Sequence, residues 1–386
     1  MTPTKNNAPS FEEARNRRQK VRAAGLDPNH WYAVEHEKNI APGKVVEVKF
    51  WKTSVALYRT ANGELHAIED RCAHRQVKLS IGQVEGDKLV CGYHGWGYDG
   101  AGKLADVPHE LFGRKLPNCK LRTYPLRVRY GLIWIFFGDA ERATEVPMPE
   151  IPELEGAEPW PLVTIDNTWS AHHSIIIDNV SDFTHAFLHR KYRPFSDAKL
   201  TKLEAAGDKV SLSYDSHIGG GKVTGLFVDR TAVNTNAIDL CYDYPYQWSN
   251  TGGSIKHFLS LLPIDERTTR AFFLFYFRSF KVPFLPITIP RRITEPLLEA
   301  AKLLHIGPLL DQDGWACSAE QEGYERHFDA PLMELNPAVD AFQRLTIRKW
   351  EEHLAREAQR KPRRSGGLPV VREDEVAPAA EAAEGA

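Results

Sequence analysis

The order of strand-like and helical segments along this chain of 386 residues predicts an α+β protein with two domains. Residues with strand-like spacing dominate the first part of the chain, whereas the second part combines helical runs with further strand-like runs. A polar stretch with five prolines lies between the two parts. We therefore place a domain boundary near residues 145–160.

The first domain is expected to be rich in strands. β-Branched and aromatic residues recur at strand-like spacing over residues 45–70, with a hairpin turn at residues 61–63, and strands resume over residues 121–139. The resulting division is an N-terminal extension (1–27), a first domain (28–146), a proline-rich linker (147–161), a second domain (162–360) and a disordered tail (361–386).

The second domain is expected to begin with a helix. Residues 170–192 contain no glycine or proline and carry a periodic apolar pattern, which predicts one helix over the run. The strand-like segments that follow are 209–218, 222–229, 239–248, 256–264 and 269–280. Two helical stretches, roughly 293–327 and 337–360, close the domain.

Charge and composition argue against several classes of function. The 49 basic and 51 acidic residues give a formal charge of −2, so no overall field draws the chain to nucleic acid or to an anionic membrane. The N-terminal 25 residues lack the apolar core of a signal peptide, and no stretch of eighteen apolar residues follows. Five cysteines form no even disulfide framework. These features predict a soluble, cytoplasmic protein without a membrane span.

Two short loops contain the donor atoms of a first metal site. Cys72 and His74 stand in one loop, and Cys91 and His94 stand in the other. Thiolates and imidazoles at this spacing are typical of a metal site. Structural zinc is the main alternative, but zinc fingers usually take both cysteines from one loop and both histidines from the other. A loop pair with one cysteine and one histidine in each loop resembles a Rieske [2Fe-2S] site, in which both cysteines bind one iron and both histidines bind the other.

The backbone of the second loop is rich in glycine. Gly92, Gly95 and Gly97 let the chain approach a cluster closely and offer amide groups to its sulfur atoms. The first loop departs from the pattern of many Rieske sequences, because it has Gln76 where they have glycine. This departure affects the expected backbone of the loop and not its ligands.

A second metal site is predicted in the run 170–192. Asp182, His185 and His189 are spaced i, i+3 and i+7, which places them on one face of the predicted helix. Two histidines and a carboxylate from elsewhere in the chain would complete the facial triad of non-haem Fe(II) oxygenases. A single histidine on such a face is more often a hydrogen-bonded core residue, and His172 and His173 are interpreted in that way.

Together the two patterns resemble the Rieske non-haem iron ring-hydroxylating oxygenases, in their catalytic subunit, over about residues 28–358. The resemblance implies that Asp313 is the third iron ligand, with Asp311 and Glu320 as competing carboxylates. It also implies that Asp182 bridges a cluster histidine of one subunit and an iron histidine of its neighbour. Asn179 is a weaker candidate for a supporting contact.

The spacing of the two histidines is a further point of resemblance. Three residues separate His185 from His189, as in the carbazole dioxygenase and the chlorophyllide and pheophorbide oxygenase groups. We expect this shorter spacing to keep the helix undistorted.

The resemblance also implies a fold and an activity. The fold is a β-rich Rieske domain followed by a helix-grip (START-like) catalytic domain with an antiparallel sheet. The activity is that of a terminal oxygenase, which uses O2 to hydroxylate, dihydroxylate or demethylate an aromatic or other hydrophobic substrate. The cofactors are a Rieske [2Fe-2S] cluster and a mononuclear Fe(II).

Partners follow from the same resemblance. NAD(P)H would act through a separate reductase, with or without a ferredoxin, because the chain has no GxGxxG nucleotide loop. A homotrimer is expected. Arg71, Arg75 and Lys78 flank the first loop and are hypothesised to form a basic docking patch for an acidic electron donor.

Two alternatives belong to other classes of protein. One is a Rieske electron carrier or redox sensor with a non-catalytic second domain, and the other is a lipid-binding or ligand-binding helix-grip module with a zinc site. The strands around residues 242–248 and 271–277 are aromatic, which fits either the wall of an apolar pocket or an ordinary core.

Overall fold

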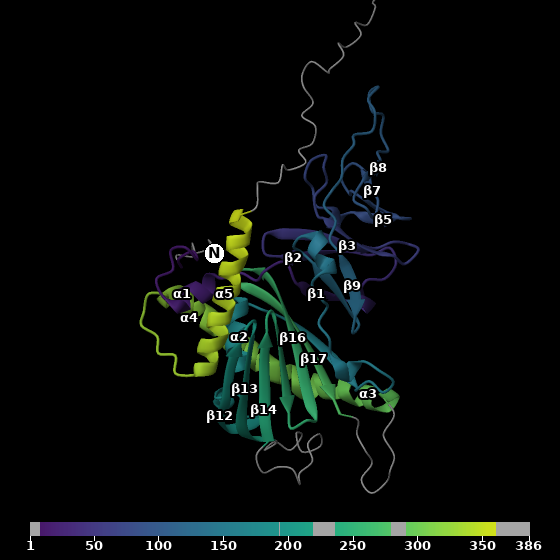
Figure 1. Ribbon diagram of the computed structural model, residues 1–386. Coiled ribbons are helices and arrows are strands. Elements are labelled where there is room, and N and C mark those ends of the chain that lie inside the picture. Colours follow the sequence, from purple (N-terminus) through teal and green to yellow (C-terminus); the bar gives the residue numbers. More distant parts are fainter. Residues whose placement is uncertain (1–7, 193, 219–235, 279–290, 360–386) are drawn as a thin grey trace, which may run out of the picture.

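The computed structural model describes residues 8–192, 194–218, 236–278 and 291–359. Small antiparallel sheets form its N-terminal part, and one large antiparallel sheet with long helices forms its C-terminal part (Figure 1). This arrangement confirms the predicted α+β class.

Three small sheets build the N-terminal part. The first joins β1 (Trp31–His36), β10 (Leu132–Phe136) and β9 (Leu126–Arg129); the second joins β2 (Val45–Phe50), β3 (Thr53–Arg59) and β4 (Leu65–Glu69); the third joins β5 (Gln83–Glu85), β6 (Lys88–Val90), β7 (Gly97–Tyr98) and β8 (Leu104–Asp106). The β3–β4 turn lies at the predicted position, where Gly63 has a φ of 95°. Residues 45–70 contain a second turn, between β2 and β3, in which Trp51 has a φ of 51°.

A seven-stranded antiparallel sheet forms the C-terminal part. Its order is β11 (Leu162–Trp169), β17 (Thr268–Phe277), β16 (Ile255–Asp265), β15 (Tyr246–Thr251), β14 (Asn236–Asp243), β13 (Lys209–Ile218) and β12 (Phe195–Ala206). Sequential strands pair from β12 to β17, so side chains from neighbouring hairpins share one face. The predicted strands at 209–218 and 256–264 lie in this sheet, and the one at 269–280 does so as far as Phe277. The single strand predicted over 239–248 is wrong, because a turn at Tyr244 and Pro245 divides it between β14 and β15. The predicted strand at 222–229 lies outside the described residues.

Five α-helices lie in the described part of the chain: α1 (Arg17–Ala23), α2 (His173–Ser181), α3 (Arg291–Ala301), α4 (Gly307–His327) and α5 (Pro337–Gln359). A π-helical turn (Lys302–Ile306) joins α3 to α4, and the resulting long helix lies along the large sheet (Figure 1). The two predicted closing helices are therefore confirmed. Short 3-10 helices cover Glu37–Asn39, Leu79–Ile81, Ala140–Thr144, Pro152–Leu154 and His185–Phe187.

One hydrophobic core runs through both parts of the molecule. It contains Trp31 and Trp134 from the first small sheet together with Phe272 from β17, all fully buried. A half-buried cation reinforces the contact, because Arg270 binds Glu35 of β1 and Asp166 of β11. This core contains residues from both sides of the proline-rich linker (147–161), so packing does not divide the chain there. The domain boundaries drawn from the sequence therefore stay predictions.

The single helix predicted over residues 170–192 is wrong. Helix α2 ends at Ser181, and Asp182 adopts an extended conformation with φ −106° and ψ 93°. Its Oδ1 accepts hydrogen bonds from the backbone N–H (2.9 Å) and the hydroxyl (2.6 Å) of Thr184. Aspartate side chains often end helices in this way, because they bind nearby backbone amides in competition with the helix. The expected undistorted spacing of His185 and His189 is wrong for the same reason.

Candidate metal centres

The loops that follow β4 and β6 carry the four residues of the predicted cluster. Cys72 and Cys91 are buried, at 2% and 4% exposure, whereas His74 is exposed and His94 is half-buried. The two imidazole rings lie side by side, with centroids 4.6 Å apart. The thiols thus face the domain interior and the imidazoles face its surface.

Both cluster loops fold with the same backbone hydrogen bond. The amide of Gln76 donates to the carbonyl of Cys72 (2.8 Å), and the amide of Gly95 donates to the carbonyl of Cys91 (3.0 Å). Gln76 and Gly95 have φ values of 59° and 71°, in the left-handed region that favours glycine. The departure noted at Gln76 therefore leaves the shape of the loop unchanged, at the expense of backbone strain.

The environment of the cysteines fits an iron–sulfur cluster. Burial raises the pKa of the Cys72 thiol, so a metal is needed to hold it as a thiolate. The hydroxyl of the buried Tyr98 lies 3.3 Å from Cys72 Sγ and accepts a hydrogen bond from the Ala73 amide (3.0 Å). Trp96 stacks on His74 with an interplanar angle of 4°.

The arrangement does not favour a single zinc ion. In the described part of the chain, one group of three or more ligand residues has its donor atoms within 4.8 Å of one another, and that group does not come from the cysteine loops. A tetrahedral zinc site would bring four donor atoms that close. Separated pairs of donors suit a cluster with two irons.

The group that does converge is His185, His189 and Asp313. Asp313 Oδ1 lies 3.2 Å from His189 Nε2 and 3.6 Å from His185 Nε2. His189 and Asp313 are buried, at 1% and 7% exposure, and His185 is half-buried. Two imidazoles and a carboxylate are the donor set of a mononuclear non-haem iron site, so these residues fit that group.

Hydrogen bonds to the far side of each ring fix the imidazole orientation. His189 Nδ1 lies 2.9 Å from the side-chain oxygen of Gln312, and His185 Nδ1 contacts the backbone carbonyl of Asp182. Both Nδ1 atoms therefore carry the proton, which leaves both Nε2 atoms free for a metal. The Asn179 amide lies 3.4 Å from Asp313 Oδ1, a weak supporting contact.

The charge of Asp313 changes the protonation of its partner. Burial alone lowers the pKa of His189, but the hydrogen bond and the negative charge of Asp313 raise it overall. A divalent cation between the same atoms would displace that proton.

Of the three candidate carboxylates, Asp313 belongs to the convergent group, and the other two have different surroundings. Asp311 is exposed, and Glu320 binds the buried Arg22 (2.7 Å). His172 and His173 lie apart from the three convergent residues: His172 Nδ1 contacts Ser174 Oγ and His173 Nε2 contacts the Ala24 carbonyl, each at 2.8 Å.

Asp182 touches one of the three convergent residues, His185, through its backbone and not through its carboxylate. In addition to Thr184, the carboxylate accepts a hydrogen bond from the Asn336 side chain (2.9 Å), while the carbonyl contacts His185. The side chain is half-buried.

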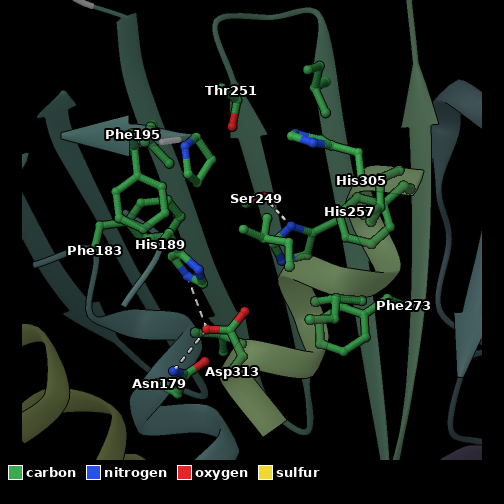
Figure 2. Close-up of a pocket in the computed structure, with 18 of the residues that line it drawn as sticks. Asn179, Phe183, His189, Phe195, Ser249, Thr251, His257, Phe273, His305 and Asp313 are labelled. Atoms are coloured by element: carbon green, nitrogen blue, oxygen red, sulfur yellow. Dashed lines mark hydrogen bonds and ion pairs between the residues drawn. The ribbon is translucent and has the colours of Figure 1, made fainter. Parts of the chain in front are cut away.

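An apolar cavity adjoins the three convergent residues (Figure 2). Phe273, Phe275 and Phe277 alternate along β17 and line it, so of the two interpretations left open for 271–277 the pocket wall applies to these three residues. Residues 242–248 instead contribute Tyr242 and Tyr244 to the core. Besides Asn179 and the three convergent residues, the polar lining comprises Ser249, Thr251, His257 and His305.

Several residues at this site were not singled out from the sequence. Gln312 directly precedes Asp313, and that adjacency was an available signal. His257 interrupts an apolar strand, and Gln247 and Ser249 alternate on the neighbouring strand. Their meeting depends on the register of β15 and β16, which the sequence pattern does not specify.

The fold and the two sites define an iron–sulfur oxygenase with a second, mononuclear metal centre. Known families match both parts: the Rieske [2Fe-2S] domain matches residues 30–125, and the vanillate O-demethylase oxygenase C-terminal domain matches residues 169–357. The 4beta-methylsterol monooxygenase of Methylococcus capsulatus (strain ATCC 33009 / NCIMB 11132 / Bath) is 46% identical over 357 residues, which cover 92% of this chain and 95% of the relative.

Solved structures share the fold. Dicamba monooxygenase bound to 3,6-dichlorosalicylic acid has a TM-score of 0.70 at 21% identity, covering 87% of this chain and 100% of that chain. The oxygenase of carbazole 1,9a-dioxygenase, in its reduced complex with ferredoxin, has a TM-score of 0.60 at 19% identity, covering 86% and 91%.

The chain belongs to the Rieske non-haem iron oxygenases. It is an enzyme that oxidises its substrate with O2, and its cofactors are a Rieske [2Fe-2S] cluster and non-haem iron, with NAD(P)H as an indirect source of electrons. Among the helices in the described part of the chain, we find none that is long and apolar enough to cross a membrane.

Proposed function

We propose that this chain is the terminal component of a monooxygenase that oxidises a methyl group at C-4 of a sterol. The observation that carries the proposal is the 46% identity to a 4beta-methylsterol monooxygenase over nearly the whole of both chains. Substrate class can change with few residues in a cavity, so the cavity must also suit such a molecule.

The cavity beside the iron-site residues supports a large apolar substrate. Few polar groups line it, and aromatic and aliphatic side chains make most of its wall. These apolar side chains are Phe183, Phe195, Ile238, Ile255, Phe273, Phe275, Phe277, Leu298, Leu309 and Leu310. A sterol is a fused-ring hydrocarbon with one hydroxyl group. Burying such a skeleton against these side chains stabilises the complex by about 25 cal/mol for each Å² removed from water.

We further propose that Cys72, His74, Cys91 and His94 hold the cluster, and that His185, His189 and Asp313 hold the mononuclear iron. When bound, these groups supply electron transfer and O2 activation. The chain's own residues would orient the imidazole Nε2 atoms for a metal, exclude water through the apolar lining and bind the substrate in the adjoining cavity.

The electron path is proposed to run between subunits of a homotrimer. Figure 1 shows β7 and β8, beside the cluster loops, at the end of the molecule away from β13 and β14. Apolar side chains are exposed at both ends of this path, with Tyr93 at the cluster loop and Phe187 and Trp315 beside the iron-site residues. An interface between neighbouring copies would cover them.

Asp182 is suited to connect the two metal centres across that interface. Its carbonyl contacts His185, and its half-buried carboxylate is held by Thr184 and Asn336. We propose that this carboxylate accepts a hydrogen bond from a cluster histidine of the neighbouring subunit.

A ferredoxin, a reductase or both are proposed as electron donors. The basic docking patch has little free charge, because Arg71 binds Glu69 (2.7 Å) and Lys78 binds Glu47 (2.6 Å). We therefore expect a weaker dependence of donor turnover on salt than three free cations would give.

Product analysis tests the proposed substrate. The holoenzyme would be supplied with an electron donor system, a 4-methylsterol and ¹⁸O2. We expect one ¹⁸O atom in an oxidised C-4 methyl group, identified by mass spectrometry. Reduction of the cluster without any oxidised sterol would contradict the proposed substrate.

A matched pair of variants tests the proposed iron ligand. Asp313→Ala should abolish product formation and lower bound iron by about one atom per chain, while the cluster is retained. Asp311→Ala removes an exposed carboxylate two residues away on α4 and should leave both quantities unchanged. Equal effects of the two substitutions would contradict the assignment.

A further inference from the structure

A chain of three polar side chains crosses the wall of the substrate cavity. Ser249 on β15 and His257 on β16 are cross-strand partners, and both line the cavity. Gln247 lies two residues before Ser249 on β15 and contacts the same histidine. Gln247 and Ser249 are buried, at 0% and 3% exposure. Figure 2 shows Ser249 and His257 across the cavity from His189.

The hydrogen bonds of this chain have a defined direction. The amide nitrogen of Gln247 donates to the Trp248 carbonyl (3.3 Å), which turns the amide oxygen toward His257 Nε2 at 2.8 Å. Since an amide oxygen can only accept, His257 Nε2 must carry the ring proton. His257 Nδ1 is then an acceptor, and the Ser249 hydroxyl, 2.7 Å away, must donate to it.

The surroundings of His257 keep this direction fixed. Its ring packs edge-on to Phe273 and Phe275, with centroids 6.1 and 5.6 Å away. Burial lowers the pKa of His257 to about 4, so the imidazole is neutral at pH 7. A neutral ring bound at both nitrogen atoms has a single favourable tautomer here.

Because the Ser249 hydroxyl directs its proton to His257 in a hydrogen bond, its oxygen presents only lone pairs to the cavity. We propose that Ser249 is a specificity-determining residue that accepts a hydrogen bond from a hydroxyl group of the substrate, and that the cavity therefore prefers an alcohol to the corresponding ketone. This inference rests on the proposed function, because the hydroxyl group of a sterol is attached to C-3, next to C-4.

A ketone is disfavoured because it brings a second acceptor to Ser249. To bind it, the serine would have to turn its proton away from His257, and Nδ1 of this half-buried ring would lose its donor. Sites built around a buried hydrogen bond reject partners that leave polar groups unpaired. Gln247 acts as a positioning residue, since it sets the tautomer without touching the substrate.

Equilibrium binding to the anaerobic holoenzyme tests the proposal, with a radiolabelled 4-methylsterol and its 3-ketone as the two probes. We expect the wild-type protein to bind the alcohol roughly 3- to 10-fold more tightly, the range of one net hydrogen bond. Ser249→Ala should remove that preference by weakening alcohol binding. Ser211→Ala is the matched control, because it deletes a serine hydroxyl from the same sheet, bound to Cys241 and away from the cavity.

The positioning role of Gln247 has its own readout. Gln247→Leu should release the histidine tautomer, so that Ser249 can donate to the ketone and ketone binding improves several-fold. Equal wild-type affinities for the two probes, or a preference that survives Ser249→Ala, would overturn the inference.

The same measurements separate this inference from the proposed function. An enzyme that oxidises the sterol at C-4 but binds alcohol and ketone equally supports the proposed function and overturns the role of Ser249. An enzyme that leaves C-4 unoxidised but loses alcohol preference in Ser249→Ala overturns the proposed substrate and supports the role of Ser249.

Discussion

The hydroxyl of Tyr98 is expected to raise the reduction potential of the cluster. It lies 3.3 Å from Cys72 Sγ and accepts the Ala73 amide (3.0 Å), so its own proton is directed at the sulfur atom. Burial, followed by the hydrogen bond to Cys72, raises the pKa of Tyr98, which keeps it a donor across the physiological range. A donor to a cluster ligand stabilises the reduced state, because that state carries one more negative charge.

The size of the effect follows from the strength of such a bond. Hydrogen bonds to charged groups contribute about 1.5–3 kcal/mol, and we take about 1 kcal/mol of this as the gain on reduction. For one electron, about 1.4 kcal/mol corresponds to 59 mV. Tyr98→Phe should therefore lower the potential by roughly 40 mV.

The measurement is a redox titration of the purified protein followed by its visible absorption. Tyr58→Phe is the matched control, because Tyr58 is fully buried in the same hydrophobic cluster and its hydroxyl has no hydrogen-bond partner among the residues that the structure describes. An unchanged potential in Tyr98→Phe with an intact cluster, or the same shift in both variants, would refute the reasoning.

Four further substitutions test other parts of the molecule. His94→Ala should remove the visible absorption of the cluster while about one iron per chain remains by metal analysis; loss of all iron would mean that the centres are not independent. Gln76→Gly should raise the free energy of unfolding by about 1 kcal/mol in a denaturant titration, by relieving the positive φ, and an unchanged stability would contradict that strain. Asp182→Asn should leave both metal centres loaded but slow the oxidation of substrate strongly in single-turnover assays. Mixing His94→Ala with His189→Ala subunits should restore activity if electrons cross the interface; mixed trimers that stay inactive would argue for transfer within one subunit.

The sequence predicted the parts of the fold that depend on local pattern. The two closing helices and the β3–β4 turn could be read because periodicity and turn residues act over a few positions. The cysteine and histidine loops were predicted for a similar reason, since their donor atoms come from short segments. Asp313 lies 124 residues beyond His189, and no local pattern joins them. Its place in the prediction came from the family resemblance.

Contacts between distant segments could not be predicted. The Gln247, His257 and Ser249 chain requires a particular register of β15 against β16, and a shift of one residue would turn the side chains of the shifted strand to the other face. Trp51 is a different case, because a bulky residue with a φ of 51° is not what a turn pattern favours. Its ring packs beside His172 and His173, so tertiary packing offsets the local preference.

The wrong prediction of a single helix over residues 170–192 affects the residues that we propose as iron ligands. In a continuous helix, the carbonyl of Asp182 would accept the amide of Ala186, four residues on. Because the helix ends at Ser181, that carbonyl is available to His185 Nδ1 instead. The Asp182 carbonyl is therefore the acceptor for His185 Nδ1, as the Gln312 side-chain oxygen is for His189 Nδ1. With both Nδ1 atoms bound in this way, both Nε2 atoms point toward Asp313. The Asp182 side chain stabilises the break by binding Thr184, so one residue both ends the helix and orients a histidine that we propose as an iron ligand.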